Sequence, residues 1–267
     1  MADGNRIRIG AVSYLNTKPL VYELERFAPS AELVYGLPSW LADRLAEGRL
    51  DVAIIPSIEY LRHPGYAVVS DACIACRGPV LSVKLLSRVP MGSIRSLALD
   101  EGSRTSAALA RILLKERYGL VPQFRPLPIG ERAEDAEADA VLLIGDRAIH
   151  PPRGFFAEEW DLGEQWCRWS GLPFVFAMWT ARPGADTSAA EVALRRARDE
   201  GVAHLAAIAE QSAAHVGLTP AECLGYLRDN LHFYLGPRER RGLAAFGRLA
   251  ADLGLVPAAG GSPHANG

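Results

Sequence analysis

Long apolar runs, clustered cysteines and a large excess of one charge are all absent from this 267-residue sequence. No apolar stretch reaches about 18 residues, which argues against a transmembrane helix, and no apolar segment of the signal-peptide type follows the basic start. The formal net charge of -2 offers neither the basic patch of a nucleic-acid-binding protein nor the polybasic segment of a membrane-surface protein. We therefore expect a cytoplasmic protein that binds neither nucleic acid nor membrane.

The signatures of metals and common cofactors are also missing. The four cysteines are too few for a disulfide framework, and Cys73-x-x-Cys76 has no second pair to complete a zinc site, so we predict buried structural cysteines. The six histidines form no metal-binding motif. The sequence contains neither the glycine-rich fingerprint of a dinucleotide site nor that of a P-loop. It also lacks the G-x-S-x-G motif that carries the nucleophile of a serine hydrolase. We expect no metal and no cofactor.

Strand-like and helix-like segments alternate between small polar ends at 1–5 and about 257–267, which we interpret as disordered. Strands are predicted at 6–12, 31–35, 51–55, twice within 66–88, and at 96–99, 123–127, 138–144 and 173–180. Helices are predicted from 16–17 onward and at 38–47, 58–61, 103–118, 162–169, 188–216, 221–231 and 237–253. This alternation indicates an α/β fold with a largely parallel sheet. The pattern stops near 87–90 and restarts, which indicates two such sheets.

The loop at 13–17 lies between the first predicted strand and the first helix. In open α/β sheets, ligands bind beyond the carboxyl ends of the strands, and a helix start offers free N–H groups to an anion. Asn16 supplies both an amide donor and an acceptor there. The alternative interpretation is that Asn16 or Thr17 is simply the N-cap of the helix.

The segment 101–106 has the same position in the second run of strands and helices. Ser103, Thr105 and Ser106 gather hydroxyl donors where a helix begins, which suits a carboxylate or phosphate, although a serine N-cap is the simpler interpretation. Ser82, in the turn that joins two strands at 77–83, either faces a cleft or packs on a sheet. Two anion-binding helix starts facing a shared cleft fit a binder or enzyme of a small polar anion.

Six blocks of sequence, taken together, resemble the menaquinone-biosynthesis family of MqnA chorismate dehydratases. They occur in the expected order over about residues 6–180, and the helical remainder fits in length. The blocks are IGAVSYLNTKPL at 9–20, LDVAIIPSIEY at 50–60, GPVLSV at 78–83, SRTS at 103–106, LLIGDRA at 142–148, and DLG at 161–163 continuing to GLPFVFAMW at 171–179.

The resemblance implies a two-lobed periplasmic-binding-protein-like fold of type II, with a ligand cleft between the lobes and helices at the C-terminal end. Lobe one is expected to comprise 1–89 and 179–267, and lobe two 90–178. The implied reaction is dehydration of chorismate to 3-[(1-carboxyvinyl)oxy]benzoate in the futalosine route to menaquinone. Because loss of water makes the ring aromatic, the reaction needs positioning and proton transfer rather than a cofactor.

The family assigns functional weight to positions that correspond to Asn16 and Ser82. We expect Asn16 to orient the substrate and to hydrogen-bond the leaving hydroxyl or the developing charge, and Ser82 to bind the substrate near the reacting centre. No general base stands out, so one hypothesis is that the substrate's own enolpyruvyl carboxylate takes the proton. The remaining residues predicted to bind substrate are Ser13, Tyr14, Thr17, Ser57, Ser103, Thr105, Ser106, Gly145 and Asp146.

Two other functions remain open from the sequence. The first is the sister enzyme of the same pathway, which makes 1,4-dihydroxy-6-naphthoate from a cyclic futalosine derivative. The second is a non-catalytic binding protein for a small anion, against which the lack of a signal peptide argues.

Overall fold

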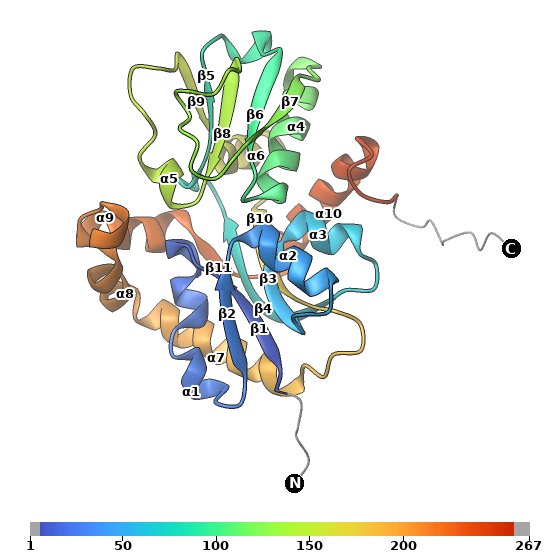
Figure 1. Cartoon of the computed structure of the whole chain (residues 1–267), viewed down its shortest axis with the longest axis vertical. Helices are drawn as coiled ribbons and strands as arrows, with labels where there is room; N and C mark the ends of the chain where they lie inside the picture. Colours follow the sequence, from blue (N-terminus) through green and yellow to red (C-terminus); the bar gives the residue numbers. More distant parts are fainter. Residues whose placement is uncertain (1–5, 259–267) are drawn as a thin grey trace, which may run out of the picture.

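Two mixed β-sheets form the framework of the molecule, and the computed structural model describes residues 6–258 (Figure 1). The first sheet has the spatial order β11 (His232–Tyr234), β4 (Ala67–Cys76), β10 (Phe174–Ala181), β3 (Val52–Pro56), β1 (Arg8–Val12) and β2 (Glu32–Gly36). β1 is parallel to β2 and β3, whereas β10 is antiparallel to both β3 and β4, and β11 is antiparallel to β4. The predicted disordered ends lie outside the described residues, apart from 257 and 258.

The second sheet lies above the first in Figure 1 and has five strands. Their spatial order is β7 (Gln123–Leu127), β6 (Ser96–Asp100), β8 (Ala140–Ile144), β5 (Val83–Ser87) and β9 (Glu158–Asp161). β6 is parallel to β7 and β8, whereas β5 is antiparallel to β8 and β9. The sheets are therefore mixed rather than largely parallel, because β5 and β10 run against their neighbours where the chain enters and leaves the second sheet.

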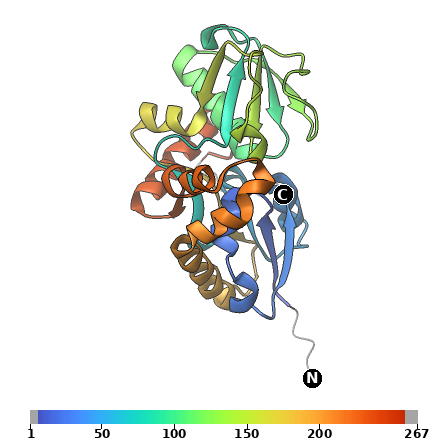
Figure 2. The same ribbon diagram turned by 90° about the vertical axis from the view of Figure 1, so that its left-hand side faces the viewer.

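The helices connect the strands and fill the last third of the chain. The 3₁₀ helices are η1 (Leu15–Val21), η2 (Met91–Ser93) and η3 (Ala213–Val216), and η4 (Tyr226–Asn230) is a π-helical turn. The α-helices are α1 (Leu24–Phe27), α2 (Pro38–Ala46), α3 (Ser57–Arg62), α4 (Arg104–Tyr118), α5 (Asp146–Ile149), α6 (Leu162–Ser170), α7 (Ser188–Ala203), α8 (Leu205–Ser212), α9 (Pro220–Gly225) and α10 (Pro237–Asp252). Figure 2 shows the C-terminal helices, coloured orange to red, beside the junction of the two sheets.

Some local predictions differ from the structure. The helix predicted over 188–216 divides into α7, α8 and η3, because His204 leaves the helical conformation at φ -114° and ψ 24°. The helix predicted from 16–17 is the 3₁₀ helix η1, and neither Asn16 nor Thr17 caps it. The short strands β9 and β11 were not predicted, since four and three residues are too few to show a clear alternation.

The chain crosses between the sheets twice. β5 lies in the second sheet and β10 in the first, so the crossovers fall at 77–82 and 171–173 rather than at the predicted boundaries after 89 and 178. We propose on this basis that lobe one comprises 6–76 with 174–258, and lobe two the segment between them. The physical reason is strand pairing: β5 is held between β8 and β9 by backbone hydrogen bonds.

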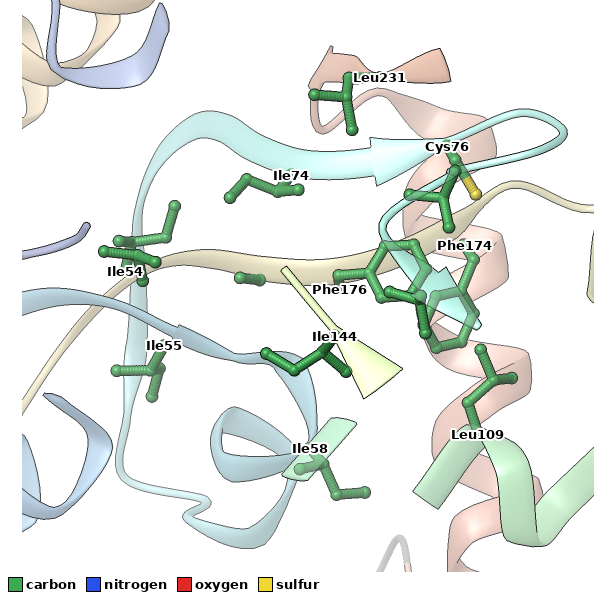
Figure 3. Packing of buried hydrophobic residues seen from close by; sticks show 14 of the residues in the cluster. Ile54, Ile55, Ile58, Ile74, Cys76, Leu109, Ile144, Phe174, Phe176 and Leu231 are labelled. Carbon is green, nitrogen blue, oxygen red and sulfur yellow. The ribbon is translucent and has the colours of Figure 1, made fainter. Parts of the chain in front are cut away.

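The largest cluster of buried hydrophobic residues continues from one sheet to the other. It includes Ile54 of β3 and Ile58 of α3 on one side, and Leu109 of α4 and Ile144 of β8 on the other. Figure 3 shows Ile144 beside Phe176 of β10 at this junction. Burying these side chains stabilises the contact between the two halves, at roughly 25 cal/mol per Å² of apolar surface. Within residues 6–258, no helix is both long and apolar enough to cross a bilayer.

Candidate active site

A small cavity of about 50 Å³ opens where the two sheets meet, below the range of roughly 300–1,000 Å³ that is typical of small-molecule sites. Its lining comes largely from the carboxyl ends of parallel strands. Tyr14 and Pro38 follow β1 and β2, and Pro56 ends β3. From the second sheet, Ser103 follows β6 and Gly145 follows β8. This is the edge at which open α/β sheets bind ligands.

Most of the residues that line the cavity are apolar, and reasoning from the sequence does not identify them as part of a site. They belong largely to buried strands and turns, and their pattern indicates only that they are core residues. Besides Pro38 and Pro56, the apolar lining residues are Val12, Ile74, Val80, Val83, Ile144, Phe176 and Ala177.

Asn16 reaches the cavity from the first turn of η1. The N-cap position belongs to Tyr14, and no side chain caps the helix, so Asn16 is not bound to the backbone at the helix start. Thr17 Oγ1 donates a hydrogen bond to Asn16 Oδ1 at 3.2 Å. This bond orients the amide so that its Nδ2 group is the donor available to a ligand.

Ser82 lies after a strained turn. Ser82 N donates to Val80 O at 2.7 Å, which closes a three-residue turn around Leu81. Leu81 has a φ of 61°, a left-handed conformation that costs a non-glycine residue about 1–3 kcal/mol and is frequent at functional sites. The Ser82 side chain is buried, lines the cavity and makes only a long hydrogen bond of 3.4 Å to Val80 O.

One carboxylate holds this turn in place. Asp161 accepts hydrogen bonds from Val80 N at 3.0 Å and from Leu81 N at 2.7 Å, and it also caps α6 through Glu164 N at 3.0 Å. Burial raises the pKa of Asp161, and these three N–H groups oppose that rise. The second sheet thereby determines the position of Ser82.

The start of α4 is the second polar side of the cavity. Ser103 is the N-cap residue and accepts a hydrogen bond from Ser106 N at 3.3 Å, and both hydroxyls line the cavity. The first two N–H groups of a helix have no partner within it. Together with the helix dipole, these N–H groups favour a negative charge at the start of α4.

Tyr14 spans the two halves of the molecule. A Cβ placed on Gly145 would lie 2.9 Å from the Tyr14 ring, and one on Gly102 would lie 3.2 Å from its hydroxyl. Gly145 also has a φ of 65°, so both its conformation and its contact with Tyr14 favour glycine. Burial, followed by the charges of Asp100 and Asp146, raises the pKa of Tyr14 to about 12. Its hydroxyl is therefore a neutral donor.

The structure brings six of the predicted residues to the cavity and places five outside its lining. The six are Tyr14, Asn16, Ser82, Ser103, Ser106 and Gly145. Of the others, Ser13 and Asp146 line a neighbouring groove, while Thr17, Ser57 and Thr105 are fully buried.

The buried hydroxyls bond to the backbone instead of facing the cavity. Thr105 Oγ1 accepts a hydrogen bond from Ile58 N at 3.1 Å across the junction of the two halves, whereas Ser57 Oγ donates to Val175 O at 2.7 Å within the first half. Asp146 accepts a hydrogen bond from Leu15 N at 3.2 Å across the junction. A carboxylate of the protein therefore already occupies the start of η1, one of the two predicted anion sites.

The chain is similar in sequence to a known protein family. Residues 7–252 match a protein family described as menaquinone biosynthesis. A chorismate dehydratase of Thermus thermophilus is 33% identical, over 92% of this chain and 95% of the relative.

Among solved structures, a protein of Archaeoglobus fulgidus superposes with a TM-score of 0.69 at 15% identity, covering 96% of this chain and 100% of the other. The alkanesulfonate-binding protein SsuA of Xanthomonas axonopodis pv. citri, bound to MOPS, gives a TM-score of 0.62 at 15% identity, over 97% and 96% of the two chains. The chain thus has the α/β fold of periplasmic binding proteins, as the sequence resemblance predicted.

Proposed function

This chain belongs to the menaquinone biosynthesis family, and from that premise we propose that it is a chorismate dehydratase, a hydro-lyase of the futalosine route. The observation that carries the proposal is the match to the Thermus thermophilus enzyme along nearly the whole of both chains. The cavity supports it, because Asn16 and Ser82, 66 positions apart in the sequence, both line it.

The reaction requires the loss of one proton and one hydroxide. The C3–H bond of chorismate breaks, its electron pair forms a ring double bond, and the C4–O bond breaks to release the hydroxyl. The products are water and 3-[(1-carboxyvinyl)oxy]benzoate, and the new aromatic ring supplies the driving force. The protein must hold the ring, bind two carboxylates and stabilise the departing oxygen.

The cavity suits the ring, one of the two carboxylates and the departing oxygen. The apolar lining, including Phe176 and Ile144, contacts the ring. The start of α4, with Ser103 and Ser106, binds one carboxylate. Asn16 donates from Nδ2 to the leaving hydroxyl, and Ser82 binds the substrate beside it.

The source of the base is part of the same proposal. None of the residues that line the cavity, all within the described part of the chain, is Asp, Glu, His or Lys. This composition favours proton transfer to the substrate's own enolpyruvyl carboxylate. Substituting Asp100 and Asp146, two carboxylates whose charges act on Tyr14, tests this route: loss of proton abstraction in either variant, with substrate still bound, contradicts it.

The direct test is incubation of the purified protein with chorismate. We expect loss of the ultraviolet absorbance of the ring diene and formation of 3-[(1-carboxyvinyl)oxy]benzoate, identified by mass spectrometry. Turnover of a cyclic futalosine derivative to 1,4-dihydroxy-6-naphthoate, with chorismate untouched, would instead identify the sister enzyme. Stoichiometric binding of chorismate with its diene absorbance unchanged would indicate a binding protein.

A further inference from the structure

Tyr226 carries a buried hydroxyl without a partner. The residue is 2% exposed, and its Oη makes no hydrogen bond of good geometry with any residue in 6–258. Buried phenol hydroxyls usually have a partner, and each exception calls for an explanation. The polar side chains near the Tyr226 hydroxyl include those of Ser82 and Asn16.

The surroundings of Tyr226 connect it to the strained turn. Tyr226 begins the π-helical turn η4, and Asn230 at the end of that turn donates from Nδ2 to Pro79 O at 3.0 Å. Pro79 directly precedes Val80 of the strained turn, so this hydrogen bond joins η4 to the crossover segment. π-Helical turns are rare and frequently occur at functional sites.

Burial determines the protonation state of the Tyr226 phenol. Burial raises the pKa of Tyr226 far above its usual range, and the hydroxyl and amide of Ser82 and Asn16 oppose the rise. The group is therefore a neutral O–H, which can donate one hydrogen bond and accept others. Because Tyr226 does not line the cavity, it contacts the substrate only through its neighbours.

We propose that Tyr226 is a positioning residue for the dehydration, whose hydroxyl orients the side chains of Ser82 and Asn16 toward the substrate. When Tyr226 donates to Ser82 Oγ, the Ser82 proton is free to leave its long contact with Val80 O and to bind a substrate oxygen. This inference rests on the proposed function, since it assigns a role within the same site.

The test is Tyr226→Phe, which removes the hydroxyl and keeps the ring. We expect kcat to fall about 3- to 10-fold, the equivalent of one neutral hydrogen bond, with KM changed less than kcat. The melting temperature should stay level or rise, because an unpaired buried hydroxyl is lost. Tyr234→Phe is the matched control, since Tyr234 lies in β11 of the same C-terminal region with its side chain 38% exposed, and its kcat should equal that of the wild type.

A double-mutant cycle separates positioning from stability. In a Ser82→Ala background, Tyr226→Phe should cost less activity than it does alone, because residues that act as a unit are not additive. Each of three results overturns the proposal. They are a wild-type kcat in Tyr226→Phe, an equal loss of activity in both backgrounds, and a fall in melting temperature that accounts for the lost activity. A wild-type protein inactive on chorismate contradicts the proposed function and this inference with it, whereas an active wild type with an unaffected variant contradicts the inference alone.

Discussion

At the residue scale, the site depends on side chains that support those in contact with the ligand. Asp161 binds the N–H groups of Val80 and Leu81 and holds Leu81 at a positive φ. Thr17 orients the amide of Asn16 in the same way. A substitution in these supporting residues is thus expected to affect the chemistry, although none of them lines the cavity.

Asn16→Ala should remove the dehydratase activity and leave the fold intact. Loss of a hydrogen-bond donor to a departing oxygen lowers kcat by about 10²–10³-fold, and the residue is only half-buried in η1. Turnover of chorismate checks the loss of activity, and circular dichroism with the melting temperature checks that the fold is intact. Gln211→Ala removes an exposed amide from α8 and serves as the control; a kcat of the wild-type level in Asn16→Ala would refute the assignment.

Asp51 should make the stability of the protein sensitive to acid. Burial alone would raise its pKa, but hydrogen bonds from Arg8 and Arg182 hold the pKa well below the ordinary value of 3.8. Because the folded pKa is the lower one, this stabilisation is present above about pH 4 and is lost as the pH falls through the folded pKa.

The measurement is urea unfolding of the wild type and of Asp51→Asn between pH 2 and 7. At neutral pH we expect the variant to be less stable by about 1–3 kcal/mol, the range for hydrogen bonds to a charged group. The difference should begin to shrink below about pH 4, where the Asp51 carboxylate of the unfolded chain gains a proton while that of the folded protein stays ionised. A difference independent of pH would contradict the role of the charge.

At the element scale, close backbone contacts place the segments that carry the site. A Cβ on Gly201 of α7 would lie 1.9 Å from Pro19 O of η1. A Cβ on Gly242 of α10 would lie 2.0 Å from Pro173 O, in the second crossover. The C-terminal helices therefore lie directly against η1, which carries Asn16, and against the crossover into β10.

Gly201→Ala should destabilise the protein by about 1–3 kcal/mol, the usual cost of overpacking. It should also lower activity, because η1 must shift to admit the methyl group. Gly225→Ala is the matched control, since a Cβ there would meet only Asp229 Oδ2, at 3.9 Å, and alanine is favoured over glycine within a helix. Equal stabilities of the two variants in urea would show that the contact between α7 and η1 can relax.

At the scale of the whole molecule, buried hydrogen bonds and a shared core join the two halves. Thr105→Val keeps the shape of the side chain but leaves Ile58 N without its acceptor. A buried N–H without a partner costs about 1–3 kcal/mol, so we expect a loss of stability of that size in urea. Faster hydrogen exchange of the Ile58 amide should accompany it; unchanged exchange would mean that another acceptor replaces Thr105.

Much of the fold could be predicted because local sequence patterns determine many of its helices and strands. The strand at 51–55 and the helix at 103–118 with its stop at Gly119 agree with β3 and α4, since apolar periodicity and capping residues act over a few positions. Cys73 and Cys76 are buried and free, as predicted. The cytoplasmic location stays a prediction.

The direction of a polar side chain could not be predicted in the same way. Ser106 lines the cavity, whereas Thr105, its neighbour on the same helix start, binds Ile58 across the junction. Asp146 binds Leu15 N in place of a substrate carboxylate. A sequence pattern indicates that such groups are near a ligand edge, but the partner of each one depends on which segment packs opposite to it.

The sequence by itself determined the α/β elements, the family resemblance and the two residues, Asn16 and Ser82, on which the proposed chemistry depends. Only the tertiary structure decided that a strained turn presents Ser82, that one predicted anion site is already filled by Asp146, and that Tyr226 faces both key residues. The physical reason is that propensity and periodicity act between near neighbours, whereas the hydroxyl, amide and phenol at 82, 16 and 226 meet only when both sheets and the C-terminal helices have packed together.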